Sequence, residues 1–240
     1  MPFAVRPTAQ APRETDLSPP HPDRILNAPP VAVALAASMP ALYWLQARLP
    51  DEGLSFAFRP SSLWDGQWWP GVLTSMLVHG GWAHVAMNAI AALAFGSPVA
   101  RLMGGVRGVF GFLAFYIACG LFATAGYGLV HPTSYDALVG ASGAVFGLMG
   151  GAIRLLGRGN GRLRGLGERR FLTTAAAIMG VNAATGLVGL APGMDGATIA
   201  WEAHAFGFVC GALLIGPWAK AFGSGRGPFD SPPETRDREI

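Results

Sequence analysis

Residues 140–151 read GASGAVFGLMGG, an apolar stretch in which small residues dominate. Gly143, Gly147 and Gly151 are four residues apart, so they would lie along one face of a helix. Small residues at this spacing let two helix backbones approach closely, which is how many helices associate within a lipid bilayer. The stretch therefore predicts a tightly packed membrane helix. It also contains Ser142, and a polar side chain inside a membrane is costly and often functional.

The composition of the whole chain supports a membrane protein. Of the 240 residues, 51% are hydrophobic and 13% are charged, against roughly 25% charged residues in an average soluble domain. Lipid solvates the outside of a membrane protein, so few surface charges are needed. The net charge of +3 comes mainly from arginines that lie between apolar segments. We therefore expect no nucleic-acid partner, and we read Cys119 and Cys210, both in apolar segments, as core residues.

Six apolar segments define the predicted fold, an all-α membrane protein with a six-helix bundle over residues 30–222. The segments are approximately 30–48, 82–99, 107–130, 138–156, 171–190 and 198–221, and most approach the roughly 20 residues that a membrane helix needs. The polar residues 1–29 and 223–240 are predicted to be disordered tails. The long first loop, about 49–81, is rich in tryptophan, which prefers the membrane interface, so we expect it to lie among the lipid headgroups.

The arginines and lysines predict the orientation of the bundle. If the six segments alternate in direction, 15 of the 17 basic residues lie on one side, and only Arg48 and Arg59 lie on the other. Basic residues concentrate in cytoplasmic loops, so both termini are predicted to be cytoplasmic. Segments two, four and six then all run inward from the outer face.

This topology places four polar side chains in one layer near the outer leaflet. His84 and Asn88 begin segment two, Ser142 begins segment four, and His204 begins segment six. Gly143 and Gly147 on segment four and Gly207 and Gly211 on segment six would let these two helices pack closely. Ser142 and His204 would then come within hydrogen-bonding reach, which is the geometry that a histidine base needs to activate a serine.

The other polar side chains in this layer could support a reaction at Ser142. His84 and Asn88 are four residues apart, so both could direct N–H groups at a developing oxyanion. Glu202 is two residues from His204 and points to another helix face, so no carboxylate completes a triad. Phe146 is one turn after Ser142 and could stack on the His204 ring. The prediction is a Ser142–His204 dyad that packing around Phe146 orients.

At these residues the chain resembles the rhomboid intramembrane serine proteases. The matching strings are HGGWAHVAMN at 79–88, GASG at 140–143 and AHAFG at 203–207, with Gly211 after the last. The resemblance extends over roughly residues 30–221. Two positions depart from the family pattern: Pro70 stands where an arginine commonly follows the first-loop tryptophans, and Phe146 stands where some relatives have tyrosine.

The resemblance implies an intramembrane serine endopeptidase that forms an acyl-enzyme. Ser142 would be the nucleophile, His204 the base, and His84 and Asn88 the lining of the oxyanion hole. Substrates would be single-pass or multi-pass transmembrane proteins, cut near the outer leaflet, and segment five would gate their lateral entry. Membrane lipid is the other expected partner, no metal or cofactor is implied, and the expected location is a bacterial inner membrane.

Two other functions fit the same residues less well. A catalytically silent relative could bind membrane helices as an adaptor, although such proteins usually lose the serine or the histidine. A metal site or transporter could use His79, His84 and His204, but no carboxylate ligand or His-Glu-x-x-His string accompanies them.

Overall fold

The computed structural model describes residues 28–67, 69–156, 163–188 and 199–223, and the two predicted tails lie outside these ranges except for residues 28, 29 and 223. The described chain is helical and contains no β-strand; an isolated antiparallel bridge joins Phe58 to Leu138. The elements are α1 (Pro30–Gln46), η1 (Leu54–Phe56), η2 (Pro60–Leu63), α2 (Gly71–Thr74), η3 (Ser75–Leu77), α3 (Trp82–Met103), α4 (Gly105–Val130), α5 (Ser142–Leu155), α6 (Arg169–Val188) and α7 (Trp201–Phe222). The predicted all-α class is confirmed.

Four of these helices are long and apolar enough to cross a membrane: α3, α4, α6 and α7. The helices α1 and α5 are also apolar but shorter. Side chains such as Ile90, Val106, Val181 and Leu187 are exposed on the outside of the bundle. Lipid tails would solvate these side chains, as expected for a multi-pass membrane protein.

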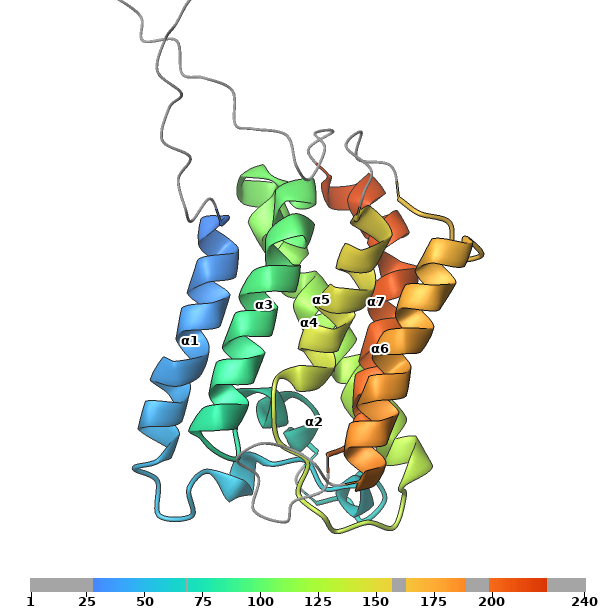
Figure 1. The fold of residues 1–240 in the computed structure, drawn as a ribbon. Coiled ribbons are helices and arrows are strands. Elements are labelled where there is room, and N and C mark those ends of the chain that lie inside the picture. Colours follow the sequence, from blue (N-terminus) through green and yellow to red (C-terminus); the bar gives the residue numbers. More distant parts are fainter. Residues whose placement is uncertain (1–27, 68, 157–162, 189–198, 224–240) are drawn as a thin grey trace, which may run out of the picture.

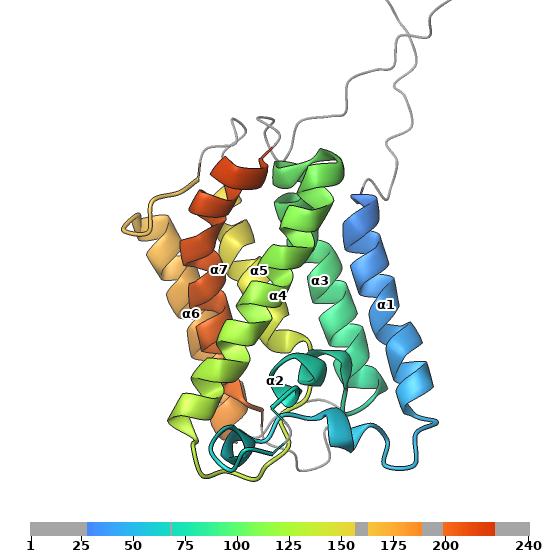
Figure 2. The same cartoon turned by 180° about the vertical axis from the view of Figure 1, so that it is seen from behind.

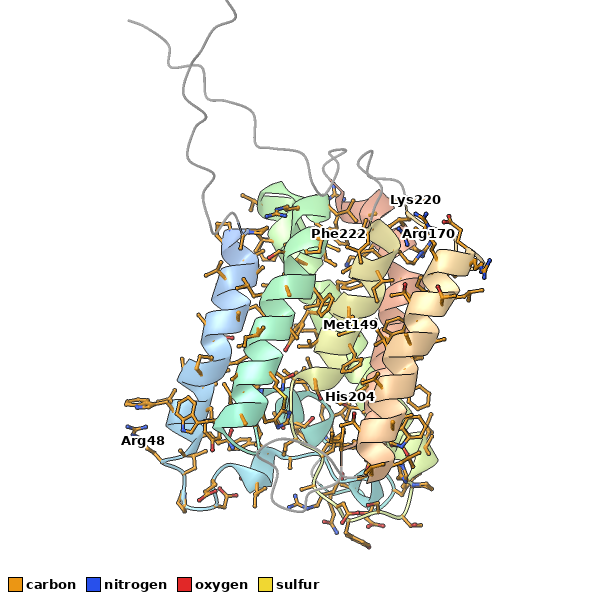
Figure 3. The ribbon with its side chains drawn as sticks, in the orientation of Figure 1. Arg48, Met149, Arg170, His204, Lys220 and Phe222 are labelled. Carbon is orange, nitrogen blue, oxygen red and sulfur yellow. The ribbon has the colours of Figure 1, made fainter. Side chains whose placement is uncertain are left out.

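The long helices stand side by side and alternate in direction (Figures 1 and 2). α3, α5 and α7 begin at the end of the bundle that also holds residues 47–81, which we call the loop end. α1 begins and α7 ends at the opposite end, where Figure 3 shows Arg170 and Lys220, whereas Arg48 lies at the loop end. We call that opposite end the basic end. This arrangement matches the separation of basic residues on which the predicted orientation rests.

Residues 47–81 pack against the helices and do not form a separate domain. Phe58 is fully buried, and its backbone pairs with that of Leu138. The buried Gln46 amide donates to the carbonyl oxygens of Glu52 and His79 and accepts from the His79 N–H. Tryptophan side chains remain exposed around this end, as expected of residues that anchor a protein in the membrane interface; they are Trp44, Trp64, Trp69 and Trp82.

The short helix α5 is packed between α4 and α7. A Cβ added to Gly207 or Gly211 of α7 would overlap the backbone carbonyl of Gly143 or Gly147 on α5. The Cβ positions of these two α5 glycines instead face Ala123 and Cys119 on α4. The α7 glycines therefore bring the α5 and α7 backbones into contact, while the α5 glycines admit α4.

Substituting Gly211 with alanine should destabilise the bundle. The added methyl group meets backbone atoms of α5, which cannot rotate away, so we expect a loss of roughly 1–3 kcal/mol or more. Gly180→Ala is the matched control, because nothing lies within 4 Å of its added Cβ, and we expect it to leave stability unchanged or raise it slightly. Thermal unfolding in detergent would measure both. Equal melting temperatures for the two variants would contradict the close approach.

Candidate active site

Ser142 and His204 meet at the start of two adjacent helices. Ser142 is the first residue of α5, and His204 is the fourth residue of α7. The Ser142 Oγ and the His204 Nε2 are 2.7 Å apart, a good hydrogen-bonding distance. An imidazole in this position can accept the hydroxyl proton, which makes the serine oxygen nucleophilic.

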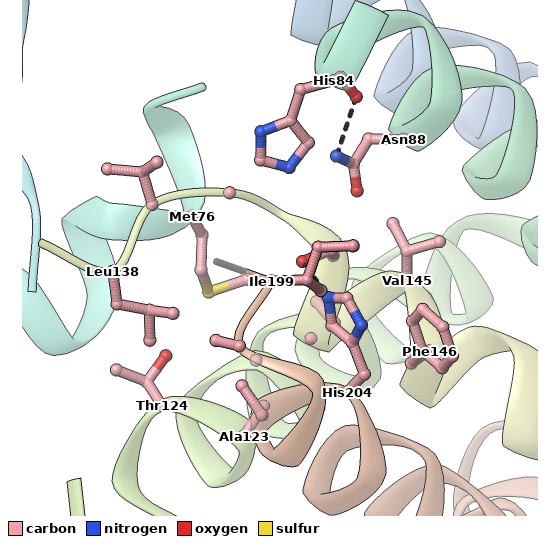
Figure 4. Close-up of a pocket in the computed structure, with 18 of the residues that line it drawn as sticks. Met76, His84, Asn88, Ala123, Thr124, Leu138, Val145, Phe146, Ile199 and His204 are labelled. Atoms are coloured by element: carbon pink, nitrogen blue, oxygen red, sulfur yellow. Dashed lines mark hydrogen bonds between the residues drawn. The ribbon is translucent and has the colours of Figure 1, made fainter. Parts of the chain in front are cut away.

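Two neighbours hold the His204 ring. The Phe146 ring stacks on it with centroids 4.3 Å apart and planes 6° from parallel, and Figure 4 shows the two rings side by side. The Asn182 Oδ1 on α6 lies 2.7 Å from the His204 Nδ1. Glu202 does not face this ring, because its carboxylate pairs with His131 at 3.3 Å. His204 thus contacts an aromatic ring and an amide where a protease triad has a carboxylate.

Asn182 is the site residue that the sequence interpretation missed. It is 7% exposed and sits in the mainly apolar half of α6 nearest the loop end. One feature of the sequence could have indicated it: a strongly polar amide inside a membrane segment is costly and therefore often functional. Its segment, however, shows no spacing that would relate it to His204.

The buried His84 imidazole presents a donor next to Ser142. The Gly80 backbone N–H donates to the His84 Nδ1 at 3.3 Å, so that nitrogen is an acceptor and the ring proton is on Nε2. A Cβ added to Gly140 would lie 2.8 Å from this Nε2 and 3.6 Å from the Ser142 Oγ. The His84 N–H and the serine hydroxyl therefore lie on the same side of Gly140.

Asn88 makes a hydrogen bond that the sequence interpretation did not include. One N–H of its amide donates to the His84 carbonyl oxygen at 2.9 Å, one turn earlier in α3, as the dashed line in Figure 4 shows. Since an amide has two N–H groups, the other can still serve a ligand. The Asn88 side chain is 4% exposed and lines the same cavity as Ser142.

The helix α5 begins four residues after residue 138, the approximate start of the predicted fourth apolar segment. Residues 135–141 are not helical: Leu138 pairs with Phe58, and Gly140 has a φ of +120°, which side chains other than glycine rarely adopt. Ser142 is therefore the first residue of α5. The first N–H groups of a helix have no intrahelical acceptor and carry partial positive charge, so the Ser142 hydroxyl sits where a negative charge would be stabilised.

A cavity of about 670 Å³ adjoins the dyad. It reaches from Met87 and Ala91 on α3 past Met149 on α5 to Asn182 and Thr185 on α6, and residues 136–140 line another side. Its size is in the range of sites that hold small organic ligands or short peptide segments. The walls of the cavity are mainly apolar.

His79 lies next to this cluster and makes no contact with Ser142 or His204. Its ring packs edge-on against His84 with centroids 5.3 Å apart, and neither ring nitrogen has a hydrogen-bond partner among the described residues. Across the described residues, no group of three or more His, Cys, Asp or Glu side chains is arranged to hold a metal ion.

Comparison with known proteins agrees with the motifs. The family model described as "Rhomboid domain" matches residues 65–220. The protein described as "Putative rhomboid protease YdcA" from Bacillus subtilis (strain 168) is 35% identical over 86 residues, which are 36% of this chain and 40% of that protein. "Rhomboid protease GluP" from the same organism is 38% identical over 85 residues, 35% of this chain and 15% of that protein. The matched regions thus span less than half of either relative.

Proposed function

The chain belongs to the rhomboid family, and we propose that it is an intramembrane serine endopeptidase acting through a Ser142–His204 dyad. The observation that carries the proposal is the 2.7 Å distance between the Ser142 Oγ and the His204 Nε2 at a mainly apolar cavity. A serine alone in a membrane helix is usually a packing residue. A serine hydroxyl in contact with an oriented imidazole is a nucleophile with its base.

The first half of the proposed reaction forms an acyl-enzyme. His204 Nε2 takes the hydroxyl proton as the Ser142 Oγ attacks the carbonyl carbon of the scissile peptide bond. The oxyanion receives hydrogen bonds from the His84 Nε2–H, the free Asn88 N–H and the N-terminal N–H groups of α5. The C–N bond then breaks, and the amine leaves with the proton from His204.

The second half repeats this chemistry with water. His204 Nε2 accepts a proton from a water molecule, whose oxygen attacks the ester carbonyl on Ser142. The ester C–O bond breaks, the proton returns to the Ser142 Oγ, and the new carboxyl end departs. No metal or cofactor takes part in these steps.

The proposed setting is a bacterial inner membrane that the chain spans six times, with both termini in the cytoplasm. In this orientation the loop end faces outward, so the dyad lies near the outer leaflet. Substrates would be single-pass or multi-pass transmembrane proteins whose cleavable segment enters the cavity from the surrounding lipid. Protease-named relatives and the concentration of basic residues at one end support this setting.

Cleavage in liposomes tests the proposal. We expect the purified protein to cut a single-pass model substrate that carries small, helix-destabilising residues in its outer half, and to do so equally well with a chelator present. Substrate that binds uncut would favour an adaptor. Cleavage that the chelator abolishes and zinc restores would favour a metal site.

A further inference from the structure

We propose that Asn182 is a positioning residue that holds His204 in the tautomer able to accept the Ser142 proton, and that it makes α6 part of the active site. This inference rests on the proposed function. It concerns a residue that none of the motifs contains, on a helix that contributes neither member of the dyad.

The hydrogen bonds around Asn182 fix which way its amide points. The Asn182 Nδ2 donates to the Trp201 carbonyl oxygen at 2.9 Å, at the first residue of α7. Since a carbonyl oxygen can only accept, the amide nitrogen must be on that side. The atom that faces the His204 Nδ1 at 2.7 Å is therefore the amide oxygen.

This orientation fixes the histidine tautomer in turn. The Asn182 Oδ1 can only accept, so the His204 Nδ1 must carry the ring proton. A neutral imidazole has one N–H, which leaves the Nε2 lone pair directed at the Ser142 hydroxyl, 2.7 Å away. In the opposite tautomer Nε2 would donate and could not act as the base. Phe146 stacks on the ring face and so fixes the ring plane, but it cannot choose between the tautomers.

The same contact ties α6 to α7. Among the described residues of α6, only Phe171 and Asn182 are buried, and 11% of its apolar window is buried, against 33% or more in α3, α4 and α7. Phe171 packs with Phe208 near the basic end. Near the loop end, α6 is held through Asn182 and through Gly186, whose added Cβ would lie 2.7 Å from the Trp201 side chain.

A functional coupling follows from this attachment. Figures 1 and 2 show α6 at the edge of the bundle, where it can move without disturbing the central helices. If the half of α6 near the loop end moves away from α7, Asn182 leaves the His204 Nδ1. The dyad is then competent for catalysis only while the half of α6 near the loop end is packed against α7.

Three variants separate the polar role of Asn182 from its packing. Asn182→Leu keeps most of the volume and removes both hydrogen bonds. Asn182→Asp, as a carboxylic acid, can still donate to Trp201 and accept from His204. Thr174→Val is the control on the same helix, because among the described residues the Thr174 hydroxyl bonds only to the Arg170 carbonyl and Thr174 does not line the cavity.

Kinetics and NMR give two independent readouts. We expect Asn182→Leu to lower kcat by roughly 10–100-fold with little change in KM, because a mis-set base slows chemistry and not binding. Asn182→Asp should recover most of that loss, and Thr174→Val should match the wild type. The tautomer is read from the NMR spectrum of histidine-labelled protein in liposomes, in which the His204 signal is the one that is absent from the His204→Gln variant. We expect this signal to show the Nδ1–H tautomer in the wild type and a mixture of the two tautomers in Asn182→Leu.

An Nδ1–H tautomer that persists in Asn182→Leu would overturn the inference, as would an unchanged kcat or an equal loss in Asn182→Asp. The NMR readout needs no protease activity. If wild-type protein cleaves nothing yet the tautomer depends on Asn182, the positioning role stands and the proposed function fails.

Discussion

Ser142→Ala is expected to abolish cleavage of a transmembrane substrate, with a fall of roughly 10⁴-fold or more to the limit of the assay. In the proposed mechanism the Ser142 Oγ bonds to the substrate carbonyl, and the alanine methyl group can neither attack nor be activated by His204. The fold should survive, because Ser142 makes no side-chain bond that caps α5. Cleavage rates in liposomes, with thermal unfolding measured alongside, check both expectations.

Ser97→Ala is the matched control for this change. Ser97 is another serine in an apolar helix, and it is buried, but its hydroxyl donates to the Leu93 carbonyl one turn earlier in α3 and it does not line the cavity. Its loss should leave the cleavage rate within a few-fold of the wild type. Comparable losses in the two variants would show that serine hydroxyls matter here for packing and not for chemistry.

Gly140→Ala is expected to lower cleavage by roughly 100-fold or more while the helices remain folded. Gly140 has a φ of +120°, and an added Cβ would lie 2.7 Å from the His84 ring. The backbone must rotate or the imidazole must move, and either change displaces the Nε2–H from the position beside Ser142. Misplacement of a catalytic group by about 1 Å can cost on the order of 100-fold in rate.

Gly105→Ala is the control that separates the effect of the overlap with His84 from the effect of backbone strain at a positive φ. Gly105 also has a positive φ, +67°, but nothing lies within 4 Å of its added Cβ, and it begins α4 at the basic end. This variant should lose some stability, roughly 1 kcal/mol, and keep its activity. A Gly140→Ala enzyme as active as Gly105→Ala would contradict the placement of His84 against the Ser142 loop.

The arrangement of the helices could be predicted because it depends on patterns local in sequence. Apolar length marks the helices, and the basic residues mark which ends lie together. The start of α5 could not be read in this way, because residues 138–141 are as apolar as the helix that follows them. What keeps them out of the helix is the pairing of Leu138 with Phe58, about 80 residues earlier, together with the φ of Gly140.

The contact between Ser142 and His204 could be predicted from the sequence for a related reason. Ser142 and His204 lie beside glycines that force their helices into contact, so spacing alone predicts that they meet. Asn182 has no comparable glycine spacing beside it, and its contact with His204 depends on how α6 packs against α7. The hydrogen bond from Asn88 to the His84 carbonyl could not be predicted either. Residue spacing indicates which side chains share a helix face, but it does not indicate which acceptor an amide group bonds to.

Covalent labelling of Ser142 tests the central claim most directly. Wild-type protein in liposomes would be treated with a fluorophosphonate, which bonds to activated serines, and the modified residue would be located by mass spectrometry of its peptides. We predict one adduct, on Ser142, that forms at least roughly 100-fold more slowly in His204→Ala because the serine then lacks its base. An unmodified Ser142, or labelling at the same rate without His204, would contradict a serine–histidine dyad in this chain.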